Sequence, residues 1–155
     1  MKSNSTAKEQ SLNPEAVTRA ETAVDHASEP LDERVLLALQ AASEKKALDI
    51  VILDLRPVAT FTDFFVLTSG ANERQVQAIS DGVYETLKKS GSAAARVEGY
   101  KTAEWILLDY GDFIVHVFEQ KARQFYDLER LWRESTKVDL PPGIVSESSS
   151  LRKES

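Results

Sequence analysis

Residues 104–119 of this chain read Glu-Trp-Ile-Leu-Leu-Asp-Tyr-Gly-Asp-Phe-Ile-Val-His-Val-Phe-Glu, and this stretch decides the fold. Two runs rich in β-forming residues, 104–110 and 112–118, lie on either side of Tyr110-Gly111. A two-residue turn that ends in glycine, placed between such runs, indicates a β-hairpin. We therefore expect two antiparallel strands here.

The turn also predicts which residues of the two strands lie opposite each other. We expect one face to hold the pairs Asp109–Asp112, Leu107–Ile114 and Trp105–His116. Because successive side chains of a strand point to opposite faces, the second face is apolar throughout and should pack on the core; it holds Ile106, Leu108, Phe113, Val115 and Val117. The first face mixes an indole, an imidazole and two carboxylates, which suits a docking surface better than a catalytic pocket.

The polar face allows two interpretations. Like charges directly across a hairpin are unfavourable, by roughly 0.2–1 kcal/mol for a cross-strand pair. A basic partner would offset the repulsion between Asp109 and Asp112, although aspartates are also common in solvated turns. Trp105 either anchors a partner, since aromatic residues dominate many binding energies, or packs beneath a neighbouring helix.

Composition limits the class of protein. A chain of 155 residues with 42% hydrophobic residues predicts one domain with a single core. The absence of cysteine excludes disulfides and thiolate zinc sites, and it favours the cytoplasm. No apolar run approaches the ~20 residues of a membrane span, and the acidic N-terminal stretch argues against a transit peptide or secretion signal. The net charge of −6 works against nonspecific binding to nucleic acid.

Hydrophobic periodicity extends the assignment outward from the hairpin. We expect helices over 31–46, 72–89 and 119–132, and further strands over 48–55, 63–68 and 95–98. The order αββαβββα predicts an α/β fold with a mixed β-sheet of about five strands flanked by helices. Residues 1–29 should form a disordered or weakly helical acidic tail, 30–134 the domain, and 135–155 a flexible C-terminal tail.

We hold two specific expectations for the closing helix over 119–132, whether it is continuous or broken. Its apolar residues Phe125, Leu128, Leu131 and Trp132 should turn inward. Arg123 and Glu129 are six positions apart, too far for a pair on one helix, so we expect Arg123 to brace an acidic residue of the sheet instead.

Several short motifs occur along the chain in an order that is specific for one protein family. They are Asp49–Leu55, Thr62–Val66, Thr68-Ser69-Gly70, Gly99, Trp105, Leu108–Asp112, His116–Phe118, Arg123, Tyr126, Leu128-Glu129 and Leu131-Trp132. In this order they resemble the ribosomal silencing factor family, called RsfS or Iojap, over roughly 31–132. The resemblance implies a nucleotidyltransferase-like fold without the catalytic carboxylates, and therefore neither an enzyme nor a protein that needs a cofactor or metal.

The resemblance also implies a partner. Members bind the large ribosomal subunit through its fourteenth protein, called here uL-fourteen, and block joining of the small subunit, which represses translation. Some members are linked to large-subunit assembly, and members can form homodimers. A protein of this negative charge would meet a basic ribosomal protein more readily than bare RNA.

The family's contact surface falls on seven positions of this chain. They are Trp105, Leu107, Leu108, Asp109, Tyr110, Asp112 and His116. The alternation of side chains sends Leu108 to the core instead. We give the alternation less weight there, because a β-bulge near the turn would shift it.

The residues leave two other functions as alternatives. An active nucleotidyltransferase would use the Ser69-Gly70 turn for phosphate and paired carboxylates for Mg²⁺, but no such carboxylate pair follows on a strand. An RNA-binding module would stack bases on exposed aromatic residues, for which Phe61, Phe64 and Phe65 are the candidates. Phe64 and Phe65 point to opposite faces, so core packing is the better interpretation of both.

Overall fold

The computed structural model describes residues 31–149, in which helices and strands follow one another closely. The elements are α2 (Glu33–Glu44), β1 (Leu48–Asp54), β2 (Phe64–Gly70), α3 (Glu73–Lys89), β3 (Arg96–Glu98), β4 (Trp105–Asp109), β5 (Phe113–Glu119), α4 (Gln120–Tyr126), α5 (Leu128–Leu131) and β6 (Thr136–Val138).

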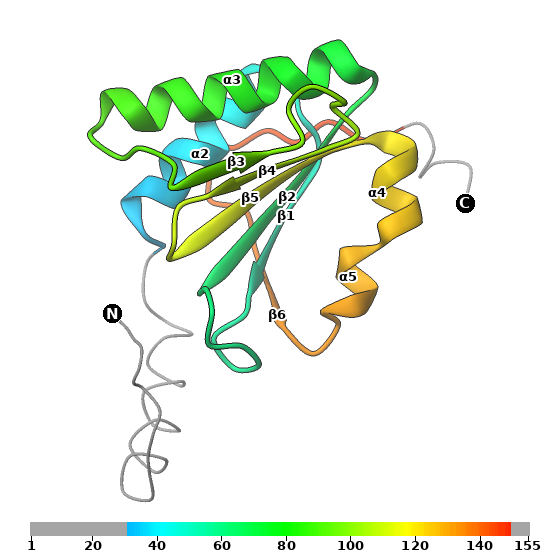
Figure 1. The fold of residues 1–155 in the computed structure, drawn as a ribbon. Coiled ribbons are helices and arrows are strands. Elements are labelled where there is room, and N and C mark those ends of the chain that lie inside the picture. The colour runs from blue at the N-terminus through cyan, green and yellow to red at the C-terminus, as the bar shows by residue number, and fades with distance from the viewer. Residues whose placement is uncertain (1–30, 150–155) are drawn as a thin grey trace, which may run out of the picture. The chain divides into compact units, whose positions relative to one another are not determined.

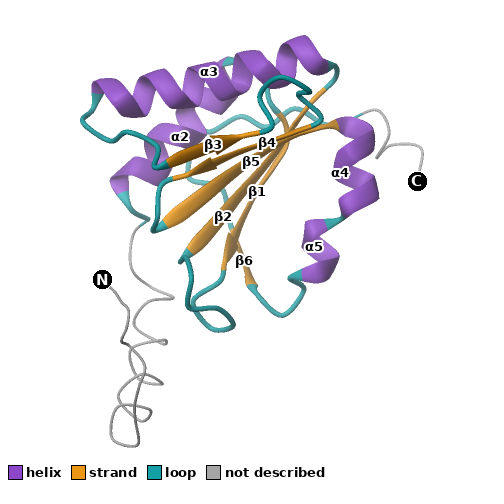
Figure 2. Ribbon diagram, viewed as in Figure 1, coloured by secondary structure: helices purple, strands orange, loops and turns teal. Residues whose placement is uncertain are grey.

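Six strands form one sheet in the order β3-β4-β5-β2-β1-β6 (Figure 2). Strands β2 and β5 run parallel in the middle of this sheet. The other neighbours, β1–β2, β1–β6, β3–β4 and β4–β5, are antiparallel. The expected α/β fold with a mixed, helix-flanked sheet is therefore confirmed, with one strand more than the five expected.

Helices lie on both faces of the sheet: α2 and α3 on one, α4 and α5 on the other (Figure 1). Helix α3 presents a stripe of fully buried residues at helical spacing, namely Val76, Ile79, Val83 and Leu87. The facing side of the hairpin is fully buried too, at Ile106, Leu108, Phe113, Val115 and Val117. Burying each such side chain contributes roughly 1.5–3 kcal/mol, so these two layers form a major part of the core.

Side-chain caps fix where the long helices begin. The carboxylate of Asp32 accepts a hydrogen bond from the backbone of Arg34, and the side chain of Asn72 accepts one from the backbone of Gln75. These caps satisfy amides that the first turn of a helix leaves without partners. Helix α2 consequently begins at Glu33.

The hairpin pairs with a register two residues away from the predicted one. Trp105 lies opposite Phe118, Leu107 opposite His116, and Asp109 opposite Ile114. The turn is built on Gly111, which has a positive φ of 86°, rather than on Tyr110-Gly111. A slip of two residues leaves each side chain of the paired strands on its predicted face, so within the strands only the pairs change. Asp112 is the exception, because it now lies in the turn and pairs with Arg34 of α2.

The C-terminal segment is ordered further than expected. Strand β6 pairs with the edge of β1, and the backbone amide of Ile50 donates to the hydroxyl of Ser146 at 2.8 Å. Ser43 donates its hydroxyl hydrogen to the carbonyl of Val145, also at 2.8 Å. Residues 136–146 therefore make contacts with β1 and α2, where the sequence predicted a flexible tail. The tail expected at 1–29 lies outside the described residues.

None of the helices within 31–149 is long and apolar enough to cross a membrane.

Candidate functional site

Trp105, the first residue of β4, is a partly buried aromatic residue on the face of the hairpin that α3 does not cover. Its indole Nε1 donates a hydrogen bond to Nδ1 of His116 at 3.0 Å. Its ring packs on Phe118, with centroids 4.9 Å apart, and on Tyr126 of α4, with centroids 4.8 Å apart. The indole is therefore held by neighbours from β5 and α4 while part of it stays in contact with solvent.

His116 lies beneath the surface, with only 3% of its area exposed. Its imidazole stands nearly perpendicular to the ring of Phe65, with centroids 4.5 Å apart. Burial, and then the positive charge of Arg123, lower the pKa of His116 to about 3. The imidazole is therefore neutral at physiological pH, and it lies beneath Trp105 rather than at the surface.

Three further residues expected at the contact surface, Leu107, Leu108 and Tyr110, do not all lie on the face that holds Trp105. Leu107 is partly buried beside the same cluster as Trp105. Leu108 is fully buried and pairs with Val115 in regular register, so no bulge turns it outward and its expected place on the surface is wrong. Tyr110 is also buried, stacked on Phe113 at 5.0 Å, and burial raises the pKa of its hydroxyl to about 12.

The two aspartates do not face each other, so the expected like-charge pair is wrong. Asp109 accepts a hydrogen bond from the backbone of Gly111 at 2.8 Å, and its carboxylate lies 3.4 Å from the guanidinium of Arg96. Asp112 forms an ion pair with Arg34 of α2 at 2.7 Å and leans toward that helix. Each carboxylate therefore already has a cation, and Asp112 belongs to the α2 side of the hairpin.

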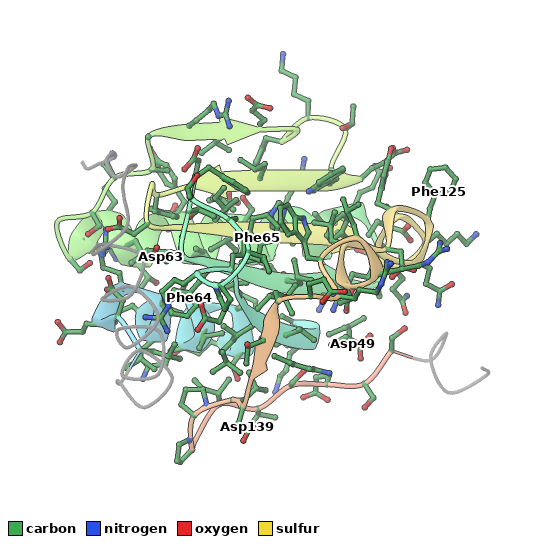
Figure 3. All side chains as sticks on the ribbon, turned by 90° about the horizontal axis from the view of Figure 1, so that it is seen from below. Asp49, Asp63, Phe64, Phe65, Phe125 and Asp139 are labelled. Atoms are coloured by element: carbon green, nitrogen blue, oxygen red, sulfur yellow. The ribbon has the colours of Figure 1, made fainter. Side chains whose placement is uncertain are left out.

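Helix α4 adds two aromatic residues that sequence reasoning did not place here. Phe125 is 80% exposed and Tyr126 44% exposed. Their rings meet at right angles, with centroids 5.0 Å apart, and Tyr126 in turn contacts Trp105. Figure 3 shows Phe125 on the outer side of α4, away from the sheet. The expectation that Phe125 turns inward is wrong, and so is the same expectation for Leu131, which is 69% exposed.

We define the hairpin surface as Trp105, Leu107, Asp109, Phe125 and Tyr126. It combines an anchored indole with an exposed aromatic pair and a short acidic edge. Large aromatic side chains on a rigid frame bind well because little entropy is lost when they are covered. The arrangement can therefore hold another macromolecule, and its exposed part includes a single carboxylate.

Gly99 supports the start of β4 from the loop before it. Its φ is +83°, and a Cβ at this position would collide with the carbonyl oxygen of Trp105. Only glycine adopts such a conformation without strain. The motif position Gly99 thus serves the placement of Trp105.

The turn that suggested a phosphate site is occupied by structural contacts. Ser69 accepts a hydrogen bond from Nη1 of Arg123 at 2.8 Å, and Thr68 donates to the carbonyl of His116 at 3.2 Å. Within the described residues, no three His, Cys, Asp or Glu side chains lie close enough to hold a metal ion. Phe64 and Phe65 are both buried, which confirms their interpretation as core residues. Phe61, the third candidate for base stacking, is 57% exposed and packs against the rings of Phe65 and Trp132.

A protein-family model described as "Ribosomal silencing factor during starvation" matches residues 28–155. A protein of Halalkalibacterium halodurans named ribosomal silencing factor RsfS is 39% identical over 114 residues, which cover 74% of this chain and 97% of that protein. A Mus musculus protein named mitochondrial assembly of ribosomal large subunit protein 1 is 29% identical over 111 residues, which cover 70% of this chain and 48% of that protein.

The fold has a solved counterpart as well. The crystal structure of a protein from Chromobacterium violaceum superimposes with a TM-score of 0.65 at 32% sequence identity. The match covers 76% of this chain and 97% of that chain.

Proposed function

The chain belongs to the ribosomal silencing factor family, and from that premise we propose that it binds the large ribosomal subunit through uL-fourteen and sterically blocks joining of the small subunit. Translation would then be repressed by contact alone, in the cytoplasm, without a reaction at any site of this chain. The mouse relative is named for the assembly of a large ribosomal subunit, which supports the choice of subunit.

The observation that carries the proposal is the anchored indole of Trp105. A blocker needs a rigid contact surface, and Trp105 sits on the central hairpin with its ring held by Tyr126 and its nitrogen held by His116. Holding the side chain before binding removes part of the entropy cost of association. Phe125 and Tyr126 extend the apolar area beside it.

Charge supports a basic protein as the partner. The whole chain carries −6, and Asp109 lies on the hairpin surface with its side chain 24% exposed. Arg96 neutralises Asp109 in part, so we assign the carboxylate a role in orientation and encounter rate more than in affinity. A partner lysine or arginine would compete with Arg96 for this carboxylate.

The test is co-sedimentation of the full chain with purified large subunits, followed by addition of free small subunits. Wild type should sediment with the large subunit and reduce joining. Trp105→Ala should weaken binding by about thirtyfold, since losing a central aromatic anchor costs about 2 kcal/mol or more. Asp109→Lys should weaken it less and make binding less sensitive to salt.

Val145→Ala provides the matched control. Val145 is 60% exposed and is bonded to Ser43 of α2, away from the hairpin surface. The Val145→Ala variant should bind large subunits as wild type does. Failure of wild type to sediment with large subunits at low salt would reject the proposed function. Binding by a folded Trp105→Ala within twofold of wild type would reject the assignment of the surface.

The homodimer implied by the family resemblance would place the same apolar residues under a second copy. Sedimentation velocity at two protein concentrations tests this directly. If dimers form and Phe125→Ala abolishes them, self-association and docking share the hairpin surface.

A further inference from the structure

His116 is a buried polar residue whose role follows from its hydrogen bonding. Its Nδ1 accepts from the indole Nε1 of Trp105 at 3.0 Å, so Nδ1 itself carries no hydrogen. A neutral imidazole has a single ring N–H, which must then be on Nε2. Nε2 is buried and finds no hydrogen-bond partner among the described residues.

A buried N–H without a partner is costly, by roughly 1–3 kcal/mol. Leucine or phenylalanine would fill this apolar site without that cost, because the neighbours of the imidazole are the rings of Phe65 and Phe118. What histidine provides here, and an apolar residue does not, is the acceptor for Trp105. The acceptor is therefore the property that distinguishes His116 from a simple core residue.

The indole needs that acceptor because of where it lies. Trp105 is partly buried between Phe118 and Tyr126, and its N–H points down into the sheet rather than out to water. Without an acceptor below, the N–H would be satisfied only if the ring rotated toward solvent. Such a rotation would change which edge of the indole the surface presents and would break its contact with Tyr126.

We propose that His116 is a positioning residue for docking: it never touches the partner, and its Nδ1 holds the indole of Trp105 in the orientation that the partner recognises. The inference rests on the proposed function, since it concerns the same surface. It also separates two residues that the family resemblance groups together, because Trp105 contacts the partner directly and His116 acts only through Trp105.

The first arm of the test measures the hydrogen bond itself. The sequence has two tryptophans, so a ¹⁵N-labelled full chain gives two indole N–H signals, and Trp132→Phe assigns them. In wild type the indole N–H hydrogen of Trp105 should exchange slowly with solvent. His116→Leu should abolish this protection, and His116→Asn should restore part of it, because the Asn side-chain oxygen can replace Nδ1 as acceptor. The signal of Trp132 serves as the internal control.

The second arm is a double-mutant cycle in large-subunit binding. His116→Leu should weaken binding by about tenfold, the size expected for loss of one hydrogen bond that fixes a central residue, with His116→Asn in between. In a Trp105→Phe background, which lacks the indole N–H, His116→Leu should change binding less than twofold. A merely structural role would give the same loss in both backgrounds, since removing packing does not depend on an N–H.

Each outcome decides something different. If wild type binds and the cycle shows no coupling, or His116→Leu keeps the Trp105 signal protected, the positioning role is wrong while the proposed function stands. If His116→Leu fails to fold, by circular dichroism and thermal unfolding, His116→Asn and its Trp105→Phe combination decide the matter by the same criterion. If wild type does not bind large subunits, the proposed function fails and the inference fails with it.

Discussion

Arg123 and Glu129 form an ion pair across the break between helices α4 and α5, with 2.8 Å between Nη2 and Oε2. A continuous helix would place residues six positions apart on different sides. Asp127, with a left-handed φ of +51°, ends α4 and turns α5 back so that the two side chains meet. The same guanidinium donates to Ser69 and to the carbonyl of Asp49, so one buried arginine joins both helices to β1 and β2.

Replacing Glu129 with glutamine should destabilise the fold. Arg123 has a side chain only 8% exposed, and it would lose the carboxylate that balances its charge. Breaking a buried pair from one side costs roughly 3–5 kcal/mol, and since the side chain of Glu129 is 35% exposed we expect about 2 kcal/mol. Urea unfolding measures this loss. The exposed Glu134→Gln is the control, and equal stabilities for the two variants would contradict the expectation.

His116 should make stability fall in mild acid. Its folded pKa is about 3, below the unfolded value of about 6.5, so between these pH values only the unfolded chain takes up the proton. The stability is therefore complete above pH ~6.5 and is lost as pH falls toward the folded pKa. Between pH 7 and 5 the loss amounts to about 2 kcal/mol.

A comparison of variants isolates this effect. Urea unfolding at pH 7, 6 and 5 should give His116→Asn a flatter profile than wild type, because asparagine takes up no proton in either state. Other acid-sensitive groups contribute equally to both proteins and cancel. Glu129 is one such group: burial raises its pKa, but the hydrogen bond and charge of Arg123 outweigh burial and lower it. Parallel profiles would show that His116 does not remain neutral in the folded chain.

Gly99→Ala should disturb the hairpin surface through the backbone. The added Cβ would meet the carbonyl of Trp105, and residue 99 would also be held at an unfavourable φ of +83°. Gly91 is a matched control, because its φ is +97° yet a Cβ there meets nothing within 4 Å. Both alanine variants pay the left-handed backbone cost of roughly 1–2 kcal/mol. Gly99→Ala should lose at least about 1 kcal/mol more and should also weaken large-subunit binding, whereas Gly91→Ala should bind normally.

Phe125→Ala should separate binding from folding. The ring is 80% exposed, so its removal should change the free energy of unfolding by less than about 0.5 kcal/mol. Affinity for large subunits should fall by about three- to tenfold, as expected for an aromatic contact beside the central anchor. Calorimetric unfolding and co-sedimentation measure the two quantities, and Val145→Ala again controls for loss of an exposed apolar side chain. Unchanged affinity would remove Phe125 from the hairpin surface.

The sequence predicted the faces of the hairpin better than its pairs. Alternation alone places Ile106 and Leu108 in the core, and both are fully buried. The register depends on which residue of the turn takes the positive φ, and this is Gly111 at the first turn position rather than the second. A local pattern around Tyr110-Gly111-Asp112 does not determine that choice.

The α4–α5 region shows a different limit. The apolar spacing of 119–132 assumes one straight helix, and Asp127 breaks it by a backbone conformation that aspartate adopts only when its surroundings favour it. Past the break, the direction of each side chain changes, which leaves Leu131 exposed and brings Glu129 to Arg123. Strand β6 was not predicted from the sequence, because three residues are too few for a periodic signal.

The parallel pairing of the two central strands, β2 and β5, affects how the chain folds during its synthesis. Among the strand pairs of 31–149, β2–β5 alone is parallel, and it pairs Phe64 with Phe113, 49 positions further along the chain. Contacts between distant residues close large loops and slow the search for the native state. During synthesis β2 stays without its central neighbour until Glu119 has been added, and β1 lacks its edge partner until Val138. A chain still emerging from the ribosome that makes it therefore lacks part of the frame of the hairpin surface, which we expect to be complete only after Val138 has been added.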